Sequence, residues 1–271
     1  MHAMKNIIRL ALKEDIGKKD LTTEAIVPKN AYAKAVIIAK EDGVIAGLSM
    51  AEEAFMHLDR NIHFKRKVKD GDFVRKGKII AEINGKARAI LTAERTALNF
   101  LQKLSGIATL TRKFVRLAGK VKIRDTRKTT PLIRKSAKYA VKIGGGENHR
   151  MDLNEILIKE NHIKAAGSVR EAIKRARRKS AHIEVEVTNL DELKEALDEK
   201  AEVILLDNMD IKNIRKAIKL AKGKAKIEVS GGVNLANIKQ IASAKPDYIA
   251  VGMLTHSSKA LDMSLEIDEV K

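Results

Sequence analysis

The second half of the chain alternates short β-branched runs with amphipathic stretches. The runs occupy residues 121–123, 156–158, 183–187, 203–206, 227–229 and 248–251. Apolar residues recur at helical spacing between most of them, in 169–178, 191–197, 211–221 and 235–242. Such an alternation predicts parallel strands joined by helices. Only residues 253–271 follow the last glycine of this pattern, so an eight-unit barrel does not fit. The pattern favours an incomplete α/β barrel of six or seven parallel strands, or an open sheet.

Up to about residue 105 the pattern is different and predicts an N-terminal α/β sandwich domain. Helical spacing is found in 4–13 and 48–58, β-branched strands are expected at 33–39 and 78–83, and 20–24 is expected to be a polar turn. Further along, Thr92 is expected to cap a helix that ends before Gly106, and a second helix should run from 107 to 118.

The change of pattern predicts two domains. The N-terminal sandwich is expected to contain residues 1–105, joined by the C-terminal tail 257–271, and the barrel is expected to contain residues 106–256.

Composition excludes several kinds of protein. Hydrophobic residues make up 44% and charged residues 33% of the 271, which is sufficient for a buried core. The absence of cysteine excludes disulfide scaffolds, thiolate zinc sites, iron–sulfur clusters and cysteine nucleophiles. Apolar runs are too short to span a membrane, and the first 14 residues lack a signal-peptide core. We therefore expect an intracellular, cytoplasmic protein with no membrane partner.

The formal net charge of +19 suits an anionic partner: nucleic acid, an acidic membrane, or a small ligand with several negative charges. Binders of single-stranded nucleic acid usually carry stacking aromatics, whereas this chain has five Phe, three Tyr and no Trp. A lysine- and glutamate-rich surface of a heat-adapted protein is an equally good explanation of the excess. The positions of the charged residues must distinguish an anionic partner from a heat-adapted surface.

Charged groups or glycine turns follow each of the six predicted strands. They are 124–129, 159–162, Glu186, Asp207 with Asn208, 230–232, and 252–255. In a parallel barrel, residues at the carboxyl ends of the strands form the active site. Taken alone, Asp207 would be interpreted as a helix cap and Glu186 as a paired interior charge. Six coincident strand ends favour a shared site instead.

The residue types suggest the ligand. Ser230-Gly231-Gly232, before a helix expected to begin near Asn234, lets backbone N–H groups approach a phosphate, and Gly252 on the next strand supports this. Glu186 and Asp207 suit ribose hydroxyls, directly or through Mg²⁺.

Basic side chains at the same edge exceed what one phosphate needs. They are Arg127, Lys128, His149, Arg150 and Lys159. His149 and Arg150 follow the glycine-rich stretch 144–146, which on its own would be a solvated connector. Arginine suits carboxylates because its planar fork makes bidentate hydrogen bonds. The set therefore indicates a ligand with several anionic groups.

Motifs along nearly the whole chain carry a family resemblance. They are Glu14-Asp15-Ile16-Gly17, Asp20-Leu21-Thr22-Thr23, Glu94-Arg95-Thr96-Ala97-Leu98-Asn99, Ser105-Gly106-Ile107-Ala108-Thr109, Thr126-Arg127-Lys128-Thr129, Gly144-Gly145-Gly146 with Asn148-His149-Arg150, Leu157-Ile158-Lys159 with Asn161-His162, Glu184-Val185-Glu186, Leu205-Leu206-Asp207-Asn208, Ser230-Gly231-Gly232, and Val251-Gly252 with Leu254-Thr255-His256. With these motifs the sequence resembles the quinolinate phosphoribosyltransferase family. Leu132 stands where the family pattern usually has glycine, and Met151-Asp152-Leu153 stands where Gly-Leu is common.

The resemblance implies transfer of a phosphoribosyl group from 5-phosphoribosyl pyrophosphate to quinolinate, with decarboxylation, in NAD synthesis. It implies Mg²⁺ as cofactor and assigns the site residues as follows. Arg95, Arg127, His149, Arg150 and Lys159 bind the quinolinate carboxylates; Thr126 belongs to the same site; Lys128 and Lys159 lie near the phosphates; Glu186 and Asp207 serve the ribose and Mg²⁺; Ser230, Gly231, Gly232 and Gly252 hold the 5′-phosphate. Lys159, Glu186 and Asp207 are the expected catalytic residues.

The resemblance also implies a homodimer with shared active sites, or a hexamer built from such dimers, in which Arg95 reaches the neighbouring subunit's barrel. No nucleic-acid partner is expected. Two alternatives remain open at this point. One is a related branch associated with molybdenum transport, which the intact run Lys159-Glu160-Asn161-His162 disfavours. The other is an anion- or nucleic-acid-binding module.

Overall fold

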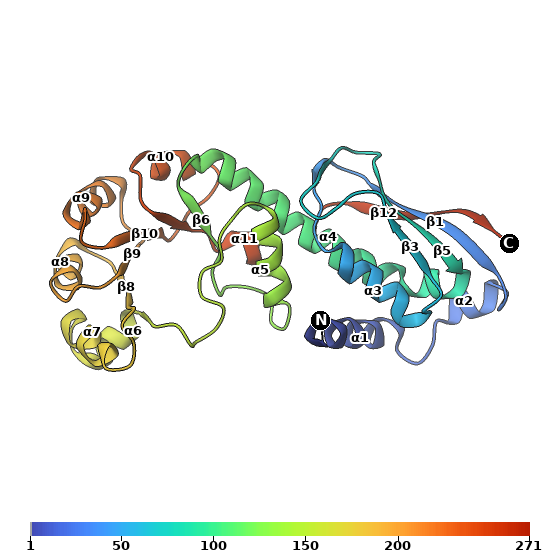
Figure 1. Cartoon of the computed structure of the whole chain (residues 1–271), viewed down its shortest axis with the longest axis horizontal. Coiled ribbons are helices and arrows are strands. Elements are labelled where there is room, and N and C mark those ends of the chain that lie inside the picture. Colours follow the sequence, from blue (N-terminus) through green and yellow to red (C-terminus); the bar gives the residue numbers. More distant parts are fainter. Residues whose placement is uncertain (1) are drawn as a thin grey trace. The chain divides into compact units, whose positions relative to one another are not determined.

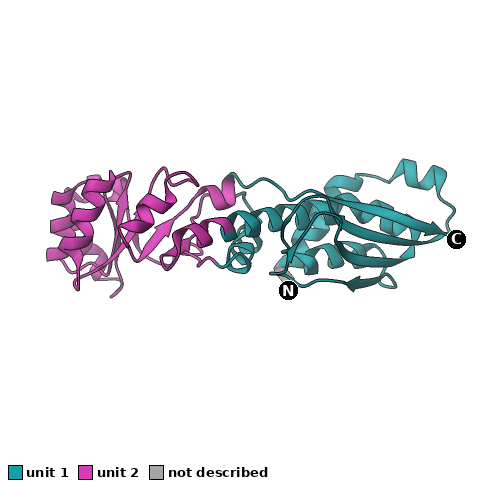
Figure 2. Cartoon of the chain, turned by 90° about the horizontal axis from the view of Figure 1, so that it is seen from above, with its two compact units in different colours: residues 1–112, 130–145, 257–271 teal, residues 113–129, 146–256 magenta. Residues whose placement is uncertain are grey.

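The computed structural model describes residues 2–271, and the chain divides into two compact units (Figures 1 and 2). Unit 1 contains the residues up to 112 together with 130–145 and 257–271, and unit 2 contains 113–129 and 146–256. The C-terminal tail thus belongs to the same unit as the N-terminal half. Residues 130–145, which the sequence pattern placed in the barrel, also belong to unit 1.

Unit 1 contains a four-stranded antiparallel sheet, a two-stranded sheet and five helices. Its elements are α1 (His2–Ile16), α2 (Leu21–Ile26), β1 (Tyr32–Ala39), β2 (Gly43–Val44), α3 (Leu48–Leu58), β3 (His63–Arg66), β4 (Phe73–Val74), β5 (Ile79–Lys86), most of α4 (Ala87–Ala118), α5 (Arg134–Ile143) and β12 (Met263–Val270). The larger sheet has the order β12-β1-β5-β3, and β2 pairs with β4. Burial alternates at the start of β1 and becomes continuous over Val36 and Ile37, because β1 lies between two partners.

The expected break at Gly106 is wrong: α4 is one helix of 32 residues. Glycine disfavours helices, but at position 106 the backbone of the C-terminal tail packs into the space that a side chain would occupy. A Cβ on Gly106 would overlap the carbonyl oxygen of Lys259 and lie 3.0 Å from the Cα of Ala260. Gly106 is therefore a close-approach residue, and the helix ends at Ala118, before Gly119 with φ +64°.

The helix cap expected at Thr92 is also wrong, since α4 already begins at Ala87. Thr92 lies inside the helix, and its Oγ1 donates to Asp20 Oδ2 at 2.9 Å. The expected polar turn at 20–24 is instead the start of α2, where Asp20 is the cap and Asp20 Oδ1 accepts from Thr23 N. A short helix with few apolar residues has no periodic pattern to distinguish it from a turn.

Helix α5 lies close to α4 within unit 1. The Arg112 side chain donates to the carbonyl oxygens of Gly144 and Ile143 at 3.0 and 3.2 Å. A Cβ on Gly144 would lie 2.5 Å from the Cβ of Thr111, so glycine is required for this approach. Before α5, Leu132 has φ +69°, a left-handed conformation that favours glycine. The backbone at Leu132 thus adopts the left-handed conformation that favours glycine, at the position where the family pattern has glycine.

Unit 2 contains six parallel strands with helices between them. Its elements are β6 (Lys122–Arg124), β7 (Leu157–Ile158), α6 (Glu160–Ala166), α7 (Val169–Arg177), β8 (Glu184–Val187), α8 (Leu190–Asp198), β9 (Val203–Asp207), α9 (Ile211–Ala221), β10 (Lys226–Ser230), α10 (Ile238–Ser243), β11 (Tyr248–Ala250) and α11 (Met253–His256). All six strands coincide with the predicted runs to within two residues. Helix α6 was not predicted, because its seven residues are all solvent-accessible and show no apolar stripe.

The strand order β6-β11-β10-β9-β8-β7 shows how the sheet is built. The first strand of the unit lies beside the last, so the order is that of a barrel with one pairing missing, between β6 and β7. This confirms the predicted α/β architecture with six strands. Among the described residues, no helix combines the length and apolar character needed to cross a membrane.

The tight contact at Gly106 gives a testable prediction. Alanine is favoured over glycine inside a helix by about 1 kcal/mol. Gly106→Ala should nevertheless lower the free energy of unfolding by about 1–3 kcal/mol, because its methyl group would displace the Lys259 backbone. Urea unfolding measures the change. The exposed Lys113→Ala on the same helix is the control and should change stability by less than about 0.5 kcal/mol. Stabilisation by Gly106→Ala would contradict the close approach.

Candidate active site

A cavity of about 480 Å³ lies at the carboxyl ends of the strands of unit 2. The structure brings eleven of the thirteen predicted site residues to its wall. They are Thr126, Arg127, Lys128, His149, Arg150, Lys159, Glu186, Asp207, Ser230, Gly231 and Gly232. They come from five strand ends and one loop, as expected when parallel strands deliver their carboxyl ends to one edge.

Two predicted residues do not line the cavity. A Cβ on Gly252 would lie 3.5 Å from the Lys128 side chain, so Gly252 stands directly behind a lining residue. Arg95 belongs to unit 1, where it is exposed on α4. It lies in the third turn of that helix and not, as expected, in the first.

The two acidic residues are held in different ways. Glu186 on β8 accepts from Lys159 Nζ at 3.0 Å, and Lys159 directly follows β7. Asp207 ends β9 and accepts from Asn208 Nδ2 at 2.9 Å. The alternative that Asp207 caps a helix is wrong, since the cap of α9 is Asp210. Both carboxylates thus remain available to the cavity.

A glycine turn forms the wall beside Asp207, since Ser230 is paired with Asp207 in the sheet. Asn208 has φ +53°, and its backbone N–H donates to Ser230 O at 3.0 Å. Gly231 and Gly232 have φ +91° and +60°, conformations that favour glycine. A Cβ on Gly231 would overlap Asn208 Oδ1. The turn therefore combines backbone N–H groups with the absence of side chains, which suits close approach of an anion.

The expectation that a helix begins near Asn234 is wrong. The Nδ2 groups of Asn234 and Asn237 donate to Gly232 O at 3.2 and 2.9 Å, and α10 begins only at Ile238. These asparagine turns replace the first turn of the expected helix. A phosphate at this end of the cavity would therefore be bound by the turn itself.

The loop after β6 is anchored on both sides. Thr126 Oγ1 accepts from Lys128 N at 3.1 Å, and the buried Thr255 donates from Oγ1 to Lys128 O at 2.7 Å. These contacts fix the backbone of Lys128 while its side chain stays exposed. This geometry suits a Lys128 side chain that adjusts its position to a charged ligand.

Two arginines in the cavity carry more positive charge than their surroundings compensate. Burial, together with the charge of Arg127, lowers the pKa of Arg150 below its usual value. Arg127 Nε and Arg150 Nε are both buried, and neither has a hydrogen-bond partner among the described residues. Crowded cations with unused donors are the arrangement expected where an anionic ligand binds.

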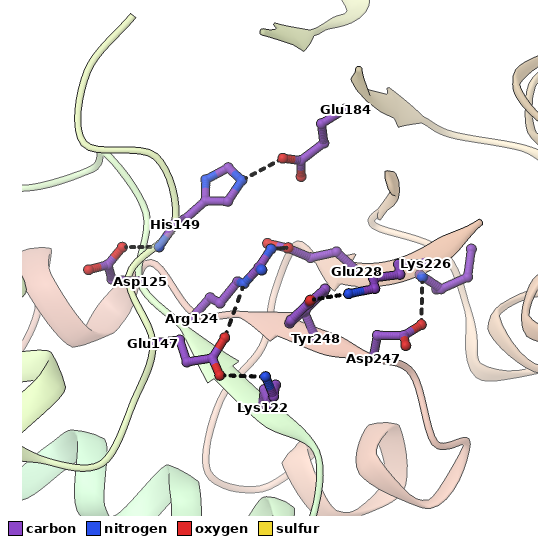
Figure 3. A network of polar contacts seen from close by, with 11 residues as sticks. Lys122, Arg124, Asp125, Glu147, His149, Glu184, Lys226, Glu228, Asp247 and Tyr248 are labelled. Atoms are coloured by element: carbon purple, nitrogen blue, oxygen red, sulfur yellow. Dashed lines mark hydrogen bonds and ion pairs between the residues drawn. The ribbon is translucent and has the colours of Figure 1, made fainter. Parts of the chain in front are cut away.

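Sequence reasoning missed a cluster of largely buried charges at this wall, which we call the buried charge cluster: Arg124, His149, Glu184 and Glu228 (Figure 3), of which His149 and Glu228 line the cavity. His149 Nε2 lies 2.8 Å from Glu184 Oε2, and Arg124 donates to Glu228 Oε2 at 2.7 Å. The Arg124 guanidinium also covers the Tyr248 ring, 3.3 Å from its centroid. Arg124, Glu184 and Glu228 each stand two residues before a predicted site residue, so strand alternation alone could have placed them on the same face.

The cluster shifts the pKa values of two of its members. Burial raises the pKa of Glu228 to about 7, and the charge of Glu184 adds to this effect, against the opposing charges of His149 and Arg124. Burial opposes the charged form of His149, but its hydrogen bond to Glu184, together with the charges of Glu184 and Glu228, outweighs burial and raises the pKa of His149. The imidazole is therefore a cation over a wider pH range than a free histidine.

Comparisons with known proteins agree in one family. The model of the quinolinate phosphoribosyl transferase N-terminal domain matches residues 20–105, and that of the C-terminal domain matches residues 107–266. A protein of Bacillus subtilis described as a probable nicotinate-nucleotide pyrophosphorylase (carboxylating) is 43% identical, covering 97% of this chain and 93% of its own.

Solved structures give the same result. The nicotinate-nucleotide pyrophosphorylase of Francisella tularensis is 41% identical with a TM-score of 0.94, covering 98% of this chain and 96% of its own. NadC from Streptococcus pyogenes is 42% identical with a TM-score of 0.93, covering 98% and 95% of the two chains.

The glycine turn gives a second prediction. Gly231→Ala should weaken binding of inorganic phosphate roughly tenfold, because the new methyl group displaces Asn208 and disturbs its hydrogen bond to Asp207. Calorimetric titration measures the affinity. Gly223→Ala is the matched control: its φ of +75° imposes the same backbone strain, but nothing lies within 4 Å of its Cβ. Equal affinities in the two variants would contradict the role of the turn.

Proposed function

The chain belongs to the quinolinate phosphoribosyltransferase family and is an enzyme of NAD synthesis, and we propose that the cavity of unit 2 is its active site. The reaction joins quinolinate to 5-phosphoribosyl pyrophosphate and yields nicotinate mononucleotide, pyrophosphate and carbon dioxide. The observation that carries this placement is the crowding of Arg127 and Arg150, whose buried Nε donors lack partners among the described residues. A dicarboxylate supplies the missing negative charge.

Quinolinate is assigned to the basic side of the cavity. Arg127 and Arg150 offer planar forks that match carboxylates, His149 adds a fixed cation, and Lys159 bridges toward the acidic side through Glu186. Four cations for two carboxylates favour quinolinate over a pyridine with a single carboxylate, which would leave buried cations unpaired.

The phosphoribosyl donor is assigned to the opposite side. Ser230, Gly231 and Gly232 hold the 5′-phosphate with backbone N–H groups, and Lys128 reaches the pyrophosphate. Glu186 and Asp207 accept hydrogen bonds from the ribose hydroxyls. This assignment places the anomeric carbon between the acids and the pyridine ring.

Mg²⁺ fits the donors that the cavity offers. Glu186 and Asp207 provide hard carboxylate oxygens on neighbouring strands, and Mg²⁺ usually binds one or two carboxylates together with substrate phosphates. When bound, the ion neutralises charge on the departing pyrophosphate. Lys128 and Lys159 serve the same leaving group from the protein.

The chemistry needs no covalent nucleophile. The ring nitrogen of quinolinate attacks the anomeric carbon as its bond to pyrophosphate breaks, and positive charge develops on the ribose. Glu186 and Asp207 stabilise that charge electrostatically, while the basic residues align the pyridine. The new pyridinium then favours loss of the C2 carboxylate as carbon dioxide: the bonding pair stays on C2, which takes up a proton.

We infer from the family a homodimer, or a hexamer of dimers, in which Arg95 completes the site of the other subunit. A solvent-exposed arginine that bears a family motif and lies outside the cavity's own unit supports this arrangement. A cytoplasmic location is proposed with it. The nucleic-acid alternative does not account for Glu186 and Asp207 in the same cavity, since carboxylates repel a phosphate backbone.

The function is tested by release of carbon dioxide from carboxyl-labelled quinolinate. Release should require both 5-phosphoribosyl pyrophosphate and Mg²⁺ and should match nicotinate mononucleotide formation one for one. Nicotinate in place of quinolinate is the specificity control. Its kcat/KM should be lower by a factor of about a hundred or more, because buried cations are left unpaired. Turnover without Mg²⁺ would contradict the cofactor, and equal use of nicotinate would contradict the carboxylate assignment.

The shared site is tested by mixing two inactive variants, Arg95→Ala and Asp207→Asn. After dissociation and random reassembly, half of the dimers are mixed, and each mixed dimer has one intact and one doubly defective site. About a quarter of full activity should therefore return. Subunit exchange is verified with tagged chains. If exchange occurs and no activity returns, each site is complete within one chain.

A further inference from the structure

We propose that Glu184 is a positioning residue, whose carboxylate fixes the orientation of the His149 ring and keeps that ring a cationic part of the cavity wall. The inference rests on the proposed function, because the ligand that His149 faces is the substrate assigned above. Glu184 itself is not among the residues that line the cavity, so it acts through His149.

The contacts of His149 support a fixed orientation. Its backbone N–H donates to the buried Asp125 Oδ1 at 2.9 Å, and its Nε2 lies 2.8 Å from Glu184 Oε2. Asp125 directly follows β6 and Glu184 begins β8 (Figure 3). Backbone and ring are thus tied to two different strands, and the side chain is 8% exposed.

The groups facing His149 are mostly acidic. Besides Asp125 and Glu184, Glu228 from β10 raises the pKa of His149 and Arg124 from β6 lowers it. Glu228 is committed to Arg124 through a 2.7 Å hydrogen bond, which leaves Glu184 as the direct partner of the imidazole. Glu184 therefore has the largest share in holding the ring charged.

A divalent metal is the competing explanation of the buried charge cluster. One ligand atom from each of His149, Glu184 and Glu228 lies within 4.8 Å of the others. However, Arg124 already contacts Glu228, and His149 already contacts Glu184. Each carboxylate thus has a cation on its Oε2, while Glu184 Oε1 and Glu228 Oε1 are buried without a hydrogen-bond partner among the described residues. A metal would displace or crowd both cations. Two adjacent ion pairs describe the cluster better.

Glu184→Gln tests the proposal, because glutamine keeps the shape and an acceptor oxygen but removes the charge. A histidine whose pKa is raised stays charged below that pKa and loses its charge as pH rises through it. In Glu184→Gln this loss should occur at lower pH. Above neutral pH, KM for quinolinate should rise roughly tenfold while kcat and KM for 5-phosphoribosyl pyrophosphate stay nearly unchanged, and acidification should restore KM.

NMR titration of the imidazole resonances gives a readout that does not need activity. His149→Asn identifies the His149 signal among those of the seven histidines. Its midpoint should lie above that of a free histidine in the wild-type protein and move down in Glu184→Gln. Glu202→Gln is the control, since Glu202 accepts from Ile183 N next to β8 and pairs with Arg177, away from the cavity.

The outcomes separate the two hypotheses. If the wild-type enzyme turns over quinolinate but Glu184→Gln has the same pH profile and the same His149 midpoint, Glu184 has only a structural role and the proposal is wrong. If the wild-type protein has no such activity, the proposed function fails, whereas the titration still decides the role of Glu184. Equimolar bound zinc or manganese that is lost in His149→Asn would assign the cluster to a metal and overturn the proposal. Should Glu184→Gln fail to fold, a wild-type midpoint at or below that of free histidine would overturn it as well.

Discussion

Parallel pairing of the strands in unit 2 is the constraint on which the site depends. Because β6 to β11 run in one direction, every carboxyl end reaches the same edge of the sheet, and residues as far apart in the chain as Arg124 and Glu228 become neighbours. Lys159 meets Glu186 and Asn208 meets Ser230 only through this register. Short apolar strands hold the register, so the polar residues that follow them are free to differ in chemistry without loss of the fold.

Charges in this unit fall into two kinds that differ in their compensation. Glu228 is buried and is paired with Arg124, whose guanidinium also stacks on the Tyr248 ring. Such pairs resist change, because removal of one member leaves a buried charge without its partner. Arg127 and Arg150 keep unused donors at the cavity. Unit 2 thus combines ion pairs between its charged residues with arginines at the cavity whose buried Nε donors have no partner among the described residues.

The strands of unit 2 and most residues of the cavity could be predicted from sequence, because β-branched runs mark buried strands and the residue after each run marks the active edge. The predictions that failed rested on local sequence patterns, and tertiary contacts override those patterns. Gly106 was interpreted as a helix end, yet the tail backbone occupies the space that its missing side chain leaves. Asn234 was expected to start a helix, but its side chain bonds to Gly232 O instead. Glu184 and Glu228 escaped notice because a charged residue inside a short strand looks like a solvent-facing one until its partners on other strands are known.

The position of β12 has a consequence for how the protein is made. This strand pairs with β1 along the edge of the unit 1 sheet, from Ala33 opposite Val270 to Ala39 opposite Met263, with one register shift between Lys34 and Ala35. While the ribosome is still synthesising the chain, β1 therefore has a bare edge rich in alanine, valine and isoleucine, a hazard for intermolecular strand pairing. Unit 2 lies between β1 and β12 in the chain, so its residues are synthesised before unit 1 can close its sheet. The sheet of unit 1 is thus begun before unit 2 is synthesised and completed after it, and a chain interrupted before β12 would leave β1 as an exposed, aggregation-prone strand.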